Sequence, residues 1–177
     1  MLRTVSRSTP FMLCAVAILG GLNASGPAYA AVINVDIGAT TRLFSGTGAA
    51  PDAGTTWNLL NPAASNATAT DLVDSNGNAT TIDIAESDFI INNGATVGDQ
   101  GVTDAYLLVR DFGVVFGSAA VTLSSLDTTT PYDLYLYGGG VTEGAFTNFT
   151  VDGVTLATSP VSTSTTTLTA GKDFVVF

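Results

Sequence analysis

Three aromatic side chains have the clearest potential for ligand chemistry in this sequence. Trp57 is the only tryptophan, and it stands in a stretch rich in glycine, alanine and asparagine, residues 42–62. Tyr135 and Tyr137 alternate along an extended apolar run, which places both rings on one outward face of a strand. Exposed aromatic rings can stack on the apolar faces of sugars, so these three are the candidate ligand-binding residues. The alternative, which we favour, is that Trp57 fills the core and the tyrosines cover a neighbouring strand.

Catalytic chemistry is restricted by what the sequence lacks. It contains no histidine, and its single cysteine is Cys14. Ser-His and Cys-His nucleophile pairs are therefore excluded, as are zinc and copper sites that use His or Cys ligands. Glycoside hydrolysis needs only two carboxylates. However, Glu86 and Glu143 are the only glutamates, and most aspartates stand beside Gly, Asn, Ser or Thr, as turn residues do. We predict a protein that is not an enzyme and binds no cofactor.

The run Asp-Ser-Asn-Gly-Asn at residues 74–78 invites comparison with a calcium-binding loop. An EF-hand loop has oxygen ligands at positions 1, 3 and 5, glycine at position 6 and glutamate at position 12. Here Gly77 falls at position 4 and Ala85 at position 12, so the pattern fails. A hairpin turn with Asn-Gly at its tip is the better interpretation. Calcium binding by carboxylates of separate loops, such as Asp36, is supported by no motif.

The first thirty residues have the pattern of a signal peptide. Arg3 and Arg7 give a positive start, residues 10–22 form an apolar run too short for a comfortable membrane span, and Ala28 and Ala30 satisfy the small-residue rule for cleavage. We expect cleavage between Ala30 and Ala31. The sequence thus predicts a secreted or cell-surface protein with no membrane insertion after cleavage.

The negative net charge of the chain disfavours anionic partners. The net charge is −10, and removal of the leader arginines would leave Arg42, Arg110 and Lys172 as the only basic residues. Such a surface repels nucleic acid and anionic membrane. We predict no nucleic-acid partner and consider extracellular polysaccharide the candidate partner. The oligomeric state is not predicted.

Residues 31–177 have the composition of a single all-β domain. They are rich in Thr, Val and Gly and poor in the long side chains that favour helices. Turn signals recur at short intervals, which favours an antiparallel β-sandwich, either a jelly roll of galactose-binding-like type or an immunoglobulin/fibronectin-like sandwich. Expected strands lie at residues 32–37, 72–73, 80–84, 89–91, 106–110, 112–116, 119–126, 132–137, 146–151, 154–156 and 174–177. Asp152-Gly153 predicts a second tight hairpin.

The apolar run at residues 174–177 ends the printed sequence without a polar tail. An unpaired apolar strand invites aggregation, so this strand needs neighbours. Two interpretations remain open: the domain is truncated and further strands follow, or residues 174–177 form a natural C-terminal strand between neighbours.

The segment from residue 121 to 138 carries a family resemblance. Leu126 is followed by Tyr132 at the head of the run Tyr-Asp-Leu-Tyr-Leu-Tyr-Gly, an arrangement that fits a tyrosine corner between two sheets. With residues 32–38, 44–58 and 104–110, this segment resembles the β-sandwich domain of exported bacterial proteins that carry a PEP-CTERM sorting tail. The resemblance implies association with the cell surface or exopolysaccharide. The chain has no Pro-Glu-Pro motif, so sorting is not implied.

The sequence is compatible with two alternative functions of different classes. The first is a non-catalytic structural or adhesive protein of the cell envelope or extracellular matrix. The second is a carbohydrate-binding module, free or cut from a larger extracellular enzyme, with Trp57, Tyr135 and Tyr137 as its platform. The first is our expectation.

Overall fold

The computed structural model describes residues 11–13, 15–21, 30–38, 43–51, 54–61, 66–92, 108, 112–115, 118–127, 129, 131–138, 147–159 and 167–177. All elements with bounds in this part of the chain are β-strands, which confirms the predicted all-β class. The strands are β1 (Phe11–Leu13), β2 (Ala15–Gly21), β3 (Ala30–Ile37), β4 (Asn58–Leu60), β5 (Thr68–Ala69), β6 (Asp83–Ser87), β7 (Ile90–Asn92), β8 (Phe112–Val115), β9 (Ala120–Ser124), β10 (Tyr132–Tyr137), β11 (Asn148–Val151), β12 (Val154–Ala157) and β13 (Phe174–Val176).

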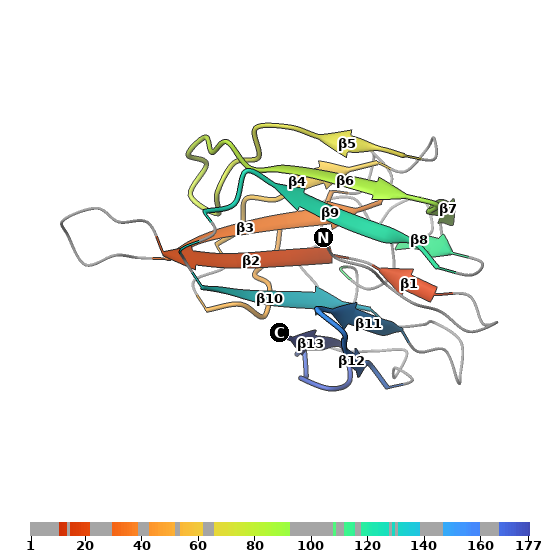
Figure 1. Ribbon diagram of the computed structural model, residues 1–177. Helices are drawn as coiled ribbons and strands as arrows, with labels where there is room; N and C mark the ends of the chain where they lie inside the picture. The colour runs from red at the N-terminus through yellow and green to blue at the C-terminus, as the bar shows by residue number, and fades with distance from the viewer. Residues whose placement is uncertain are drawn as a thin grey trace.

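The strands form four sheets (Figure 1). The largest has five strands in the order β13-β10-β2-β3-β4, and two have three strands each, in the orders β5-β6-β9 and β1-β8-β7. The β11–β12 hairpin is a sheet by itself. The pairs of named strands are antiparallel except that of β3 with β4, which is parallel. No helix within the described ranges is long and apolar enough to cross a membrane.

One buried apolar cluster joins the five-stranded sheet to the β5-β6-β9 sheet. Alternation places Ile33, Val35 and Ile37 of β3 on one face, as their sequence pattern predicted. They share the cluster with Ile84 of β6, Val121 of β9, Leu136 of β10 and Phe149 of β11. Burying a side chain of this kind stabilises the fold by about 1.5–3 kcal/mol.

The opposite face of β3 is also covered. Asn34 and Asp36 lie on that face and are 0% and 2% exposed. Residues 43–51 and 54–57 cover them: the amide of Asn34 donates to the Thr56 carbonyl at 3.2 Å, and the Phe44 N–H donates to Asp36 Oδ2 at 2.8 Å. Since both faces of β3 are buried, this strand lies deep inside the protein.

Both predicted hairpin turns are present. Asp152 and Gly153 have φ angles of 49° and 81° and join Val151 to its partner Val154, which is the left-handed two-residue turn that Asp-Gly favours. At the other turn Gly77 has a φ of 85°, and Val73 bridges Ala79. The local sequence was sufficient to predict these two turns, because a positive φ is easiest for glycine, asparagine and aspartate.

The predicted tyrosine corner is present between β9 and β10. The N–H of Asp127 donates to Tyr132 Oη at 3.0 Å, and the ring of Tyr132 is half-buried against the core cluster. The two strands belong to different sheets, β9 pairing with β6 and β10 with β2 and β13. The corner therefore fixes the crossing of the chain from one sheet to the other. Of the strand expected at residues 106–110, only Leu108 lies within the described residues, and it is helical, so the prediction of a strand is wrong at this residue.

Segments of the expected leader take part in the five-stranded sheet. β2 lies between β3 and β10, pairing with seven residues of the first and six of the second (Figure 1). Ala30 and Ala31 lie in β3 opposite Gly21 and Gly20, so the expected cleavage site is inside a β-ladder of the full-length chain. Cleavage there would remove β2, so β3 and β10 would each lose the strand that pairs with one of their edges.

Candidate functional site

Two of the three candidate aromatic residues meet in a buried cluster. The ring centroids of Trp57 and Tyr137 are 6.4 Å apart, and that of Phe44 lies 5.0 Å from Trp57, edge to face. Phe174 packs against Tyr137 with centroids 5.8 Å apart. Trp57 is 5% exposed and Tyr137 is 0% exposed. The cluster thus joins Phe44 and Trp57 to Tyr137 of β10 and Phe174 of β13.

Polar atoms of this cluster bind backbone rather than face solvent. The Trp57 indole N–H donates to the Gly46 carbonyl at 2.8 Å, and Tyr137 Oη accepts from the Ala49 N–H at 2.7 Å. Gly48 is needed for this closeness, since a Cβ there would lie 2.9 Å from Tyr137 Oη and 3.3 Å from Trp57 Cζ2. The cluster therefore holds residues 43–57 against the sheet.

The third candidate, Tyr135, is half-buried. Its ring lies 5.9 Å from that of Phe174, centroid to centroid. Alternation correctly places it on the same face of β10 as Tyr137. That face is covered at Tyr137, whereas the ligand-binding interpretation needs it to be exposed. The reason is non-local, because the covering residues come from about 90 positions earlier in the chain. A sugar cannot stack on Trp57 or Tyr137 while the cluster is closed; ligand binding by Tyr135 stays a prediction.

Tyr137 should make stability depend on alkaline pH. Burial raises the pKa of its hydroxyl to about 12, despite hydrogen bonds from the backbone of Ala49 and Ala50 that lower it. The unfolded chain ionises near pH 10, so stability is fully present below pH 10 and falls between pH 10 and 12, by up to about 3 kcal/mol. Urea unfolding across this range should show the loss in the native protein and a flatter profile in Tyr137→Phe. Parallel profiles would contradict this role of Tyr137.

Buried carboxylates hold loops in place. Asp36 accepts from Phe44 N–H, as noted above, and Glu86 accepts from the N–H groups of Ala67 at 2.8 Å and Phe89 at 3.1 Å. Asp173 Oδ2 accepts from the Thr169 N–H at 2.8 Å. All three carboxyl residues are at most 3% exposed. Hydrogen bonds to charged acceptors contribute about 1.5–3 kcal/mol each, so these side chains stabilise the connections between strands.

Asp74 organises the turn that resembled a calcium loop. Its carboxylate accepts from the N–H groups of Asn76 and Asn78 and from the Asn78 side chain, at 2.8–2.9 Å. Burial alone would raise the pKa of Asp74, but these hydrogen bonds outweigh it and the pKa is lowered. The carboxylate oxygens thus bind protein N–H groups, as the hairpin interpretation requires. In the part of the chain that the structure describes, no three His, Cys, Asp or Glu side chains form a group that could hold a metal ion.

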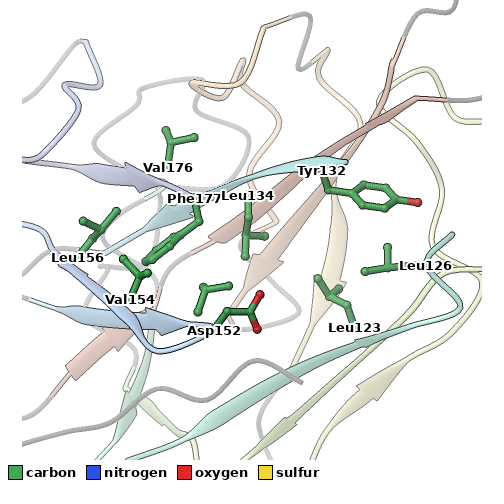
Figure 2. A pocket seen from close by; sticks show the side chains of 10 residues that line it. Leu123, Leu126, Tyr132, Leu134, Asp152, Val154, Leu156, Val176 and Phe177 are labelled. Atoms are coloured by element: carbon green, nitrogen blue, oxygen red, sulfur yellow. The ribbon is translucent and has the colours of Figure 1, made fainter. Parts of the chain in front are cut away.

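An apolar hollow lies beside the β11–β12 hairpin (Figure 2). Its volume is about 600 Å³, and side chains from β9, β10, the hairpin and the C-terminal residues converge on it. Its lining includes Leu123, Tyr132, Leu134, Asp152, Leu156 and Phe177. Sequence reasoning missed it, because these residues lie far apart in the chain. The one local signal was Val154, which stays apolar beside an exposed turn.

No protein-family model matches the chain, and neither a curated protein nor a solved structure matches it.

Proposed function

We propose that this protein is an exported, non-catalytic β-sandwich protein with a structural or adhesive role in the cell envelope or extracellular matrix. The observation that carries the proposal is the use of buried carboxylates as backbone acceptors. Asp36 and Glu86 accept hydrogen bonds from loop N–H groups, and Asp173 accepts one through Oδ2 while its buried Oδ1 has no hydrogen-bond partner among the described residues. These carboxylates therefore support the fold. A scaffold of this kind suits a protein that acts through its surface.

The sandwich architecture and the location are part of the same proposal. Two sheets that share one apolar cluster support a sandwich, of jelly-roll (galactose-binding-like) or immunoglobulin/fibronectin-like type. The corner at Tyr132 adds support to the resemblance to PEP-CTERM-type domains, and with it to extracellular polysaccharide as the partner. The carbohydrate-binding module is the weaker alternative, because Trp57 and Tyr137 are enclosed.

Cell fractionation tests the location. A bacterium that expresses the full chain should release it to the medium or retain it on the outer surface, where added protease removes it from intact cells. A matched chain with Leu13→Asp and Ile18→Asp interrupts the apolar run of the leader and should stay inside the cell. Equal intracellular retention of both chains would contradict the proposed export.

A further inference from the structure

The hollow beside the β11–β12 hairpin has exposed apolar side chains at its edge. Val154 is 56% exposed and Val176 is 38% exposed. Both line the hollow, and Leu43 is the only other large apolar side chain with comparable exposure among the described residues. Apolar side chains that lie together around a hollow can mark a ligand-binding groove. A volume of about 600 Å³ lies in the range of small-molecule sites.

The remaining lining disfavours a polar ligand. Leu123, Leu134, Leu156 and Phe177 offer only carbon atoms from their side chains. The hydroxyl of Tyr132 is turned to the backbone, where it accepts from the Asp127 N–H at 3.0 Å. A sugar in this hollow would lose hydrogen bonds to water without replacing them, which is costly. The body of the ligand must therefore be apolar.

A charged side chain, Asp152, lies at the edge of the hollow. Asp152 has the only carboxylate side chain among the lining residues, and it is exposed. It occupies the first position of the Asp-Gly turn with a φ of 49°, so its place beside the hollow is fixed by the hairpin. Figure 2 shows its carboxylate among the apolar side chains of the lining. The negative charge of Asp152 and the net charge of the chain, −10, both attract a cation to this site and repel an anion.

We propose that this hollow binds a small amphiphile with an apolar chain and a cationic head. The chain lies against Leu134 and Leu156, and the head lies at Asp152. The site is separate from the buried aromatic cluster and does not depend on where the protein is located in the cell, so it goes beyond the structural role proposed above.

Two probes with the same chain and opposite heads test the site. Octyltrimethylammonium and octyl sulfate, each below its micelle-forming concentration, are titrated into the full chain by calorimetry. The cation should bind about fivefold more tightly than the anion at low salt, a difference that shrinks at high salt. Binding of neither probe, or binding of the anion at least as tightly as the cation, would overturn the proposal.

Substitutions place the binding in the hollow. Asp152→Asn keeps the turn, because asparagine favours the same left-handed position, and it should remove most of the preference for the cation. Asp88→Asn is the matched control, since Asp88 is also exposed with a positive φ, 68°, but does not line the hollow. It should leave the preference unchanged. Val154→Thr keeps the β-branched shape but adds a hydroxyl to the lining, so it should weaken the binding of both probes. Equal effects of Asp152→Asn and Asp88→Asn would show that the overall charge, not this site, selects the cation.

Discussion

Replacing Trp57 with alanine is expected to lower the free energy of unfolding by about 3–5 kcal/mol. Trp57 is 5% exposed and touches Phe44 and Tyr137 through its ring, so alanine leaves a cavity between residues 43–57 and the sheet. The substitution also leaves the Gly46 carbonyl without its indole donor. For many domains such a loss is a large part of the total stability. Urea unfolding followed by circular dichroism measures it.

Trp57→Phe is the matched control for this experiment. It retains an aromatic ring but loses the hydrogen bond to Gly46, so its effect should be smaller, about 1–3 kcal/mol. An unchanged unfolding free energy in Trp57→Ala, together with lost retention on a polysaccharide column, would contradict the core role. Trp57 would then be an exposed sugar-binding ring, as in the carbohydrate-binding alternative.

Replacing Ala17 with proline is expected to destabilise the full-length chain strongly. Ala17 lies mid-strand in β2, where it pairs with Asn34 of β3 and with Tyr135 of β10. Proline has no N–H to donate and is confined to sheet edges and bulges. In a helix interior the same residue costs about 3 kcal/mol, and a loss of at least that size is expected here. Amide exchange of β3 and β10 should speed up in the variant. Unchanged exchange would show that β2 does not hold these two strands together.

This prediction concerns the uncleaved chain. Processing after Ala30 would remove β1 and β2, and β3 and β10 flank the position that β2 holds. Backbone groups buried without partners cost free energy, so the shortened chain would have to pair these two edges differently. We therefore expect cleavage to precede folding, because the Ala30–Ala31 bond is enclosed in a ladder once the sheet has formed.

Local chemistry predicted much of this fold. Asp152-Gly153 in one turn and Gly77 in the other have positive φ angles, which few residue types adopt easily, so both turns were predictable. Tyr132 identified the corner between the sheets, because a tyrosine at a strand start can return its hydroxyl to the preceding loop. The failed calcium pattern correctly left Asp74 as a turn residue.

Features that depend on distant residues were not predictable in the same way. Alternation places Tyr137 on the face of β10 away from the core, but it does not show that residues 43–51 and 54–57 cover this face and bury the ring. Asn34 and Asp36 alternate with apolar residues as on a solvent-facing side of a strand, yet the same segment buries them. The hollow beside the hairpin escaped notice because its lining comes from β9, β10, β12 and the C-terminal residues. Periodicity assigns a residue to a face, but only the packing of the whole chain decides whether that face is covered.

The measurement that tests the proposed function most directly is the mass of the N-terminal peptide of the protein recovered outside the cell. The proposal predicts an extracellular chain that begins at Ala31, since export and removal of residues 1–30 go together. A chain that begins at Met1 and is found only in the cytoplasm would contradict it. In that case β2 would be a permanent strand of the sheet, and an intracellular role would replace the one proposed here.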